Sequence, residues 1–455
     1  MAGIGFEIRK TLKKKTILSL FKAYSYSAIV SSGPWIISML SIFVSGYIVN
    51  NIVKDDKLTL QFTIIITYLI ALSMIITSFT QLAFTRYLAD RIFENKNHLV
   101  LPTTLTAIAL NMIIGAVAAL PYAISLYEKH SLSSALSFEF AFIFLSGVWI
   151  GNIVLSGLKN YKFITFAYFV SYLLVVGLIY YNGKDLDHLL FDFFISQGIL
   201  LILLITIIAK NYYSDKLISF DFLKKENLYI DLIFIGFFMT IAVWVDKFTF
   251  WYTPSTSKEV IGLFRYSPIY DLPIFLAYLT IAPGIAMFLL RVETEFVEEY
   301  YKYYNAVRNG GTLREIYHYG NEMIDSAKYA LIEVLRVQIL STFAFMMFAH
   351  AIFNYFHMPT VYLPIFYVDL IGVALQLFFM SISVILFYLD KRKSVLVLSI
   401  FLFLSNFVLS IITTHLGIFY YGYGFSIAYL MASILAILYL NKIFRRLHYE
   451  TFMYS

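Results

Sequence analysis

Twelve apolar runs, each long enough to cross a bilayer, constrain this sequence more than any other feature. A hydrocarbon core of about 30 Å needs roughly 20 apolar residues in one helix. Runs of this kind occupy residues 23–50, 59–85, 101–126, 136–157, 162–182, 188–210, 228–252, 268–291, 328–353, 361–389, 394–415 and 420–441. Backbone groups surrounded by lipid must be satisfied within their own segment. The pattern therefore predicts an all-α, polytopic membrane protein.

The composition argues against a soluble enzyme. Only 14% of the 455 residues are charged, against about 25% in an average soluble domain. The chain has no cysteine and no P-loop, HExxH or GxSxG motif. His350 and His357 could share a helix face but have no further ligands beside them, so we expect no metal site and no cofactor. The net charge is +6, and the basic residues lie mostly in short loops between the apolar runs. This placement indicates lipid headgroups rather than nucleic acid as the partner.

The distribution of basic residues predicts the orientation. If the amino terminus is cytoplasmic, the outside loops hold only Lys54, Lys57, Lys129, Lys184, Lys258 and Arg265, while most of the 34 Lys and Arg fall on the inside. Cytoplasmic loops carry this excess in membrane proteins. We therefore expect both termini in the cytoplasm.

Six runs precede the longest basic loop and six follow it. We predict an N-terminal six-helix bundle (1–210), a cytoplasmic linker loop (211–227) and a C-terminal six-helix bundle (228–455), arranged around a central cavity. One charged and aromatic segment, residues 292–327, is predicted to be a cytoplasmic helical insertion with a turn at 309–311.

Charged residues inside apolar runs are the main candidates for function, because each costs several kcal/mol, roughly 2.5–3.5 on insertion scales. The predicted cavity path contains Asp246, Lys247, Tyr270, Asp271, Asp369 and Trp35. Other readings remain open. Asp246 and Lys247 could simply neutralise each other, Lys247 could snorkel outward, and Asp271 could be interfacial.

Two further features suggest moving parts in the membrane. Glu333 and Arg336 are spaced i, i+3 and can pair on one helix face, either as an inner gate or as a static link between helices. Gly33 and Pro34, in the first run, predict a bend. That bend is either a functional hinge or an ordinary proline kink.

Four acidic residues begin the predicted insertion: Glu293, Glu295, Glu298 and Glu299. Their default interpretation is a solvated helix face. The alternative is a docking surface for a cytoplasmic partner with a basic patch.

Three stretches carry a resemblance to a known family: MAGIGFEIRK at the amino terminus, SSGPW in the first run, and the long segment from YDLPIFLAYL to GGTLREI. Together they resemble the PelG family of Pel exopolysaccharide transporters, in the multidrug/oligosaccharidyl-lipid/polysaccharide (MOP) flippase superfamily. The resemblance implies a bacterial inner-membrane exporter of a polymer rich in N-acetylgalactosamine. It also implies a cytoplasmic glycosyltransferase (PelF-like) and membrane partners (PelD-like and PelE-like) of the same operon.

The expected function is therefore export of an exopolysaccharide through an aromatic, weakly acidic path. Tyrosine-rich helices suit such a path, since rings stack on sugars and hydroxyls pair with sugar hydroxyls. Two rivals remain. One is a cation- or proton-coupled small-molecule antiporter of the same superfamily that uses Asp246 and Asp369. The other is a membrane scaffold for a glycosyltransferase that transports nothing.

Overall fold

The computed structural model describes residues 37–38, 41–42, 44–50, 55–157, 161–355 and 358–453. Within these residues, eleven helices are long and apolar enough to cross a membrane. They correspond to the second through twelfth predicted runs, and the helical prediction is confirmed for them. Most of the first predicted run, including Gly33, Pro34 and Trp35, lies outside the described residues.

The chain folds into two compact units. Among the described residues, the N-terminal unit runs up to Trp244 and includes Trp251–Ser267, and the C-terminal unit consists of Val245–Phe250 and the chain from Pro268 onward. Helix α8 (Ile230–Tyr252) contributes to both units. The division into six-helix bundles at residues 211–227, and the cavity between them, remain predictions.

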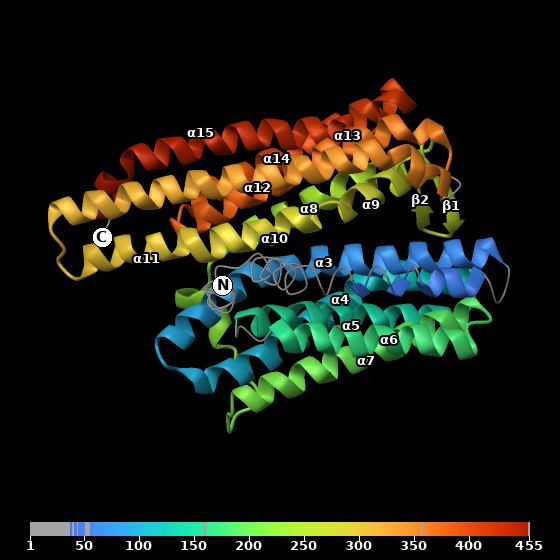
Figure 1. Ribbon diagram of the computed structural model, residues 1–455. Coiled ribbons are helices and arrows are strands. Elements are labelled where there is room, and N and C mark those ends of the chain that lie inside the picture. Colours follow the sequence, from blue (N-terminus) through green and yellow to red (C-terminus); the bar gives the residue numbers. More distant parts are fainter. Residues whose placement is uncertain are drawn as a thin grey trace, which may run out of the picture. The chain divides into compact units, whose positions relative to one another are not determined.

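The N-terminal unit is an antiparallel helical bundle (Figure 1). Its elements are α3 (Asp56–Phe93), η1 (Asn97–Leu99), α4 (Val100–Lys129), α5 (Leu132–Gly157), α6 (Tyr161–Asn182), α7 (Leu186–Asn211), η2 (Asp221–Leu223), η3 (Lys225–Asn227), most of α8, β1 (Lys258–Ile261) and β2 (Phe264–Tyr266). Helix α3 begins three residues before the predicted run 59–85, because the Asp55 side chain caps it by accepting from the backbone N–H groups of Lys57 and Leu58. Helix α5 packs against α3, α4 and α7.

A short antiparallel hairpin, β1–β2, occupies part of the predicted outer loop 253–267. Gly262 turns the hairpin with φ +54°, and a Cβ there would come within 2.0 Å of the Ser125 Oγ. The same hydroxyl accepts from the Leu263 N–H at 3.0 Å. The turn therefore requires glycine both for its backbone conformation and for its close approach to α4.

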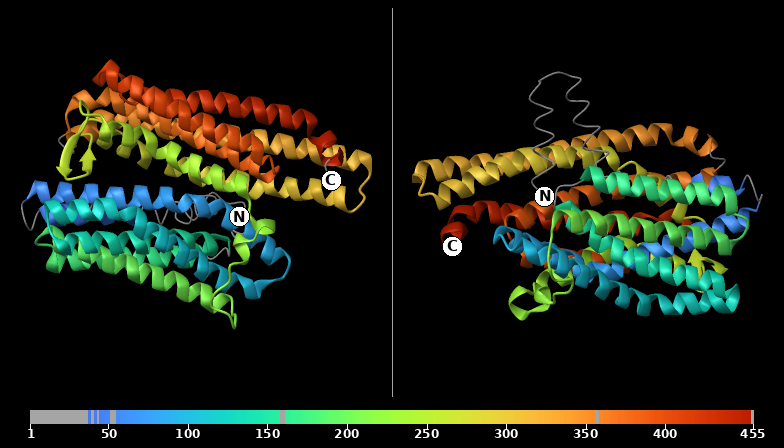
Figure 2. Two further views of the ribbon diagram at one scale, coloured as in Figure 1. Left: turned by 180° about the vertical axis from the view of Figure 1, so that it is seen from behind. Right: turned by 90° about the horizontal axis from the view of Figure 1, so that it is seen from below.

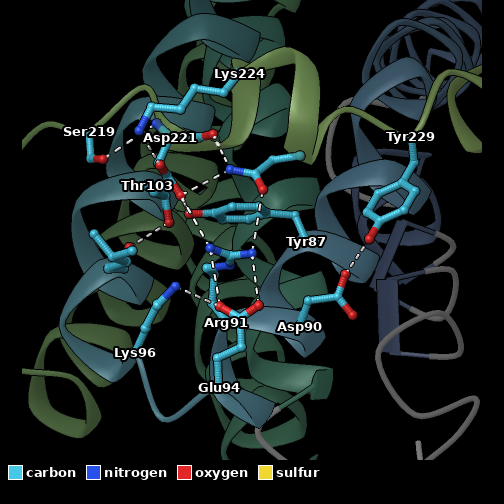
Figure 3. A network of polar contacts seen from close by, with 12 residues as sticks. Tyr87, Asp90, Arg91, Glu94, Lys96, Thr103, Ser219, Asp221, Lys224 and Tyr229 are labelled. Atoms are coloured by element: carbon cyan, nitrogen blue, oxygen red, sulfur yellow. Dashed lines mark hydrogen bonds and ion pairs between the residues drawn. The ribbon is translucent and has the colours of Figure 1, made fainter.

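The predicted linker 211–227 is held against α3 by a polar network (Figure 3). The Asp221 carboxylate accepts from the Tyr87 hydroxyl at 2.9 Å and lies 2.7 Å from the Lys224 Nζ and 3.9 Å from Arg91. Burial alone would raise the pKa of Asp221, but the hydrogen bonds from Lys224 and Tyr87, with the charges of Lys224 and Arg91, lower it. Phe222 adds an edge contact with the Phe84 ring at 5.3 Å.

The C-terminal unit consists of long helices (Figures 1 and 2). After Val245–Phe250 of α8, its elements are α9 (Asp271–Leu279), α10 (Ala282–Leu290), the π-helical turn η4 (Arg291–Phe296), α11 (Val297–Arg308), α12 (Leu313–Tyr355), η5 (Thr360–Tyr362), α13 (Leu363–Tyr388), α14 (Arg392–Leu416), η6 (Ile418–Tyr420) and α15 (Tyr423–Met453). Helix α13 is central, because it packs against α9, α12 and α15.

The predicted run 268–291 is not one helix. It breaks between α9 and α10, where Pro283 stands in the first turn of α10 and cannot donate a backbone hydrogen bond. The Thr280 carbonyl at the break accepts from the Ser341 hydroxyl at 3.0 Å and from the Gln338 amide at 3.3 Å, both on α12. A neighbouring helix thus supplies the partners that the broken helix lacks.

Helices α11 and α12 form an antiparallel hairpin that continues past the apolar runs (Figures 1 and 2). The turn falls at 309–311, where the sequence predicts it, and Gly310 adopts φ +70°. Helix α12 begins with a capping box in which Glu315 accepts from the Thr312 N–H at 2.8 Å. The end of α15 packs on this hairpin, since the Tyr303 hydroxyl donates to Thr451 at 3.1 Å.

Candidate functional site

Asp246 and Lys247, near the end of α8, form a buried ion pair in the C-terminal unit. Asp246 is 0% and Lys247 6% exposed. The Lys247 Nζ lies 3.0 Å and 3.2 Å from the two Asp246 carboxylate oxygens. Adjacent residues on a helix point about 100° apart, but the long lysine side chain reaches back to its neighbour. The mutual neutralisation considered from the sequence is therefore present in the structure.

Helix α9, its N-cap residue Tyr270 and helix α14 add neutral hydrogen-bonding groups to the Asp246–Lys247 pair. The Tyr270 hydroxyl donates to Asp246 at 2.6 Å, and Lys247 donates to the Tyr278 hydroxyl at 3.1 Å. Asn406 donates to Asp246 at 3.5 Å. Each charge of the pair therefore keeps further polar contacts inside an apolar unit, which a buried ion pair needs to offset its loss of hydration.

Aromatic rings complete the surroundings of the pair. The Lys247 Nζ lies 4.9 Å from the Tyr278 ring centroid and 5.2 Å from that of Phe425, distances at which a cation is attracted to the ring face. Tyr270 stacks on Phe250 with centroids 4.0 Å apart. The result is a tyrosine-rich site around compensated charges.

Asp369, on α13, is a different kind of group. It is 0% exposed, and neither carboxylate oxygen has a hydrogen-bond partner among the described residues. It lies within electrostatic reach of Asp246 and Lys247. The chain passes close by at Gly422, where a Cβ would come within 2.5 Å of the Asp369 Oδ1. An uncompensated carboxyl in this position can take up a proton or face a ligand.

We call Asp246, Lys247, Tyr270, Tyr278, Asp369 and Asn406 the C-terminal polar cluster. Sequence reasoning found four of these six residues and missed Tyr278 and Asn406. Asn406 could have been found as an amide in an otherwise apolar run, whereas one more tyrosine among 37 gave no signal. Asp271 is the first residue of α9, a position where a carboxylate stabilises the helix terminus.

The predicted gate residues form the expected i, i+3 contact. Arg336 donates to Glu333 at 2.6 Å, and Arg291 lies 3.9 Å from the same carboxylate. The Arg336 side chain is 67% exposed, whereas that of Glu333 is 16% exposed. The geometry shows an ion pair, and the gate function remains a prediction.

The four glutamates of the predicted docking face do not share one environment. Glu293 is 2% exposed and accepts from the Tyr388 hydroxyl at 2.8 Å. The expectation that it contributes to an exposed surface is therefore corrected, because the π-helical turn directs this residue toward α13. Glu295 pairs with Arg291. Glu298 and Glu299 both pair with Lys302, at 3.7 Å and 2.8 Å.

The C-terminal polar cluster offers hydroxyls, an amide, aromatic rings and an excess of one acidic group. Such a site can bind polar, uncharged or weakly cationic groups. Within the described residues, no group of three or more His, Cys, Asp or Glu side chains could hold a metal ion. We assign no catalytic chemistry to these residues.

Several solved structures share the fold at low sequence identity. An outward-facing multidrug resistance MATE family transporter of the MOP superfamily matches with a TM-score of 0.66 and 14% identity, over 94% of this chain and 96% of that one. A MOP superfamily transporter from Pyrococcus furiosus matches with a TM-score of 0.63 and 14% identity, again over 94% and 96%. A MATE crystal structure in the straight conformation matches with a TM-score of 0.63, 16% identity and the same coverage. The fold is therefore that of MOP superfamily transporters.

The comparison with curated proteins gives no significant match. The family model described as "PelG: Putative exopolysaccharide Exporter (EPS-E)" matches residues 1–452, nearly the whole chain. The candidate spans of the described residues show a multi-pass membrane protein, and the match of the family model shows that the chain belongs to the PelG family of exopolysaccharide exporters.

Proposed function

We propose that this protein exports an exopolysaccharide rich in N-acetylgalactosamine from the cytoplasm across the bacterial inner membrane. The match of the PelG family model to residues 1–452 carries the proposal. The C-terminal polar cluster supports it, because tyrosine hydroxyls and rings around compensated charges suit an uncharged or amino-sugar chain. The path itself is proposed to include Asp246, Lys247, Tyr270, Asp271, Asp369 and Trp35.

The charge of this cluster argues for a sugar chain rather than a lipid diphosphate. A diphosphate needs cationic donors that remain available to it. Lys247 is already bound by Asp246 at 3.0 Å, and Asp369 adds a further acidic group. A phosphate approaching this cluster would therefore find the Lys247 cation already engaged by Asp246.

Export is tested in inverted membrane vesicles. Vesicles that contain the chain and its cytoplasmic glycosyltransferase are supplied with a labelled sugar nucleotide, and polymer protected from added glycosidase is counted. We expect protected polymer only when the chain is present, and less of it in Tyr270→Phe and Asp246→Asn vesicles. Polymer that is equally protected without the chain would reject the proposal. Protection that is unchanged in Tyr270→Phe and Asp246→Asn vesicles, with synthesis lost when the cytoplasmic helices are altered, would favour the scaffold role.

We further propose that both termini are cytoplasmic. The sparse basic residues of the outer loops support this orientation. In spheroplasts, an impermeant amine reagent should label Lys129 and Lys258 but not Lys224 or Lys302. Labelling of Lys302 from the outside would reverse the orientation.

The proposed partner is a cytoplasmic glycosyltransferase that docks on α11, with membrane proteins of the same operon beside it. The exposed part of this helix supports the proposal, since Glu298 is about half exposed and Tyr301 is 51% exposed. Acidic and tyrosine side chains together suit a basic partner patch. Glu295 lies one turn away and is included in the surface.

A second candidate function is ion-coupled antiport of a small molecule, which Asp369 favours. Its two buried oxygens, which have no hydrogen-bond partner in the described part of the chain, are suited to reversible protonation. In proteoliposomes with an acidic interior, candidate substrates of the antiporter would release protons through the wild type but not through Asp369→Asn. Polymer export that is insensitive to proton uncouplers, with no such release, would exclude this candidate.

A further inference from the structure

The N-terminal unit contains a second buried polar cluster that the proposed function has not used. It lies on α5, α6 and α7 with one residue of the first run: Asn152, Tyr168, Ser171, Tyr172, Gln197 and Ser38. We call it the neutral cluster, because it contains no charged side chain.

Close helix packing places its two amides. Gly151 faces Leu204 of α7, where a Cβ would be 3.4 Å from that side chain, and Gly198 faces Phe144 of α5 at 2.8 Å. Small residues let membrane helices approach in this way. Asn152 and Gln197 are the direct neighbours of these two glycines, each about 100° round its helix from that contact.

Gln197 is the central observation. It is 0% exposed, and neither its side-chain oxygen nor its nitrogen has a hydrogen-bond partner of acceptable geometry among the described residues. It stands near the middle of α7 (Leu186–Asn211), and α7 is one of the candidate spans. An unsatisfied amide at that depth is costly, because bulk water is not at hand. Such a group is expected to have a ligand.

The neighbours of Gln197 are hydroxyls and rings. Its amide lies beside the Tyr172 hydroxyl, which also lies beside Ser38. Tyr172 stacks on Tyr168 with centroids 6.0 Å apart and planes inclined by 13°. Asn152 donates to the Tyr168 hydroxyl.

Two more polar atoms of the neutral cluster have no hydrogen-bond partner among the described residues. The Asn152 carbonyl oxygen and the Ser171 hydroxyl are buried and also lack partners within the described residues. Free donors and free acceptors therefore occur together. A phosphate only accepts and an ammonium only donates, whereas a sugar hydroxyl or an acetamido group does both.

We propose that the neutral cluster is a binding subsite for the hydroxyl and acetamido groups of an uncharged sugar residue. Gln197 and Asn152 form its hydrogen bonds, and the stacked Tyr168 and Tyr172 rings contact the sugar face. The inference rests on the proposed export function and specifies its substrate class. It assigns the recognition of neutral sugars to the N-terminal unit.

The test is binding of a tetrasaccharide of N-acetylgalactosamine to the purified, full-length protein in nanodiscs, with thermal unfolding measured in parallel. Gln197→Met removes the amide at similar volume, and Tyr172→Phe removes one hydroxyl but keeps the ring. Thr206→Val is the matched control, because Thr206 is an exposed residue of α7 whose hydroxyl donates to the Ile202 carbonyl of the same helix at 2.8 Å.

We expect Gln197→Met to weaken the Kd roughly fivefold to twentyfold, with unchanged or higher thermal stability, because an unsatisfied group is removed. Tyr172→Phe should weaken binding by a smaller factor, and Thr206→Val should not change it. If Gln197→Met binds as the wild type does but unfolds at lower temperature, the amide is structural and the subsite is rejected. If the wild type binds no sugar but still exports polymer, the subsite alone is rejected. If it binds no sugar and exports no polymer, the proposed function fails as well.

Discussion

The buried pair Asp246–Lys247 gives the sharpest test of how the C-terminal unit is stabilised. Lys247→Met keeps most of the side-chain volume but leaves Asp246 without its cation. Removing one partner of a buried pair costs about 3–5 kcal/mol. Asp246 keeps its hydrogen bonds from Tyr270 at 2.6 Å and from Asn406 at 3.5 Å, so we expect a loss of unfolding free energy near the lower limit, about 3 kcal/mol.

The reciprocal change, Asp246→Asn, leaves Lys247 buried beside the Tyr278 hydroxyl and two aromatic rings. A desolvated cation–π contact contributes about 2 kcal/mol, which offsets only part of the lost ion pair. We expect a cost of about 1–3 kcal/mol. Replacing both charges together removes the buried charges as well as the pair. The double variant should therefore cost no more than either single variant.

The assay is a double-mutant cycle of denaturant unfolding in mixed micelles, followed by tryptophan fluorescence. The expected coupling energy is about 3 kcal/mol, at the upper end for contacting residues. Lys302→Met, which breaks exposed ion pairs of α11, is the control and should cost less than about 1 kcal/mol. If the two single losses add up to the double loss within about 0.5 kcal/mol, the two residues are not coupled and the reasoning is refuted.

Three further predictions concern other parts of the chain. Gly422→Ala should destabilise the C-terminal unit by about 1–3 kcal/mol, because φ is +85° and the new Cβ would meet Asp369. Gly417→Ala is the control for the backbone contribution, since Gly417 has φ +101° and its Cβ would lie in open space. Equal losses in thermal unfolding for the two variants would show that the contact with Asp369 contributes nothing. Because the folded-state pKa of Asp221 is lowered, Asp221 should stabilise the linker above about pH 4, and this stabilisation should be lost as the pH falls further. Limited proteolysis of residues 212–229 should show the loss in the wild type but no such transition in Asp221→Asn. Identical pH profiles for the two proteins would contradict the prediction. Glu298→Lys with Glu299→Lys should weaken co-purification of the glycosyltransferase, more at low salt than at high salt, whereas undiminished capture would leave α11 as a solvated extension.

The sequence alone could predict most of the helices but not all of their interruptions. Each apolar run is a local property, and lipid forces the backbone of such a run to satisfy itself. Within the described residues, every predicted run from the second to the twelfth is matched by a candidate span. The break at Thr280 could not be placed from Pro283 alone, because a proline that merely kinks a helix and a proline that breaks it stand in similar sequence patterns. The partners that stabilise the break, Ser341 and Gln338, come from another helix.

The same distinction applies to the functional residues. The sequence by itself determined that Asp246, Lys247 and Asp369 are costly charges in apolar runs, since hydropathy is read along the chain. Only the tertiary structure decided that Asp246 is bound by Lys247, Tyr270 and Asn406 while Asp369 has no partner among the described residues. Asn406 is separated from Asp246 by 160 residues. Whether such residues meet depends on how side-chain volumes on several helices fit together, and no single segment contains that information.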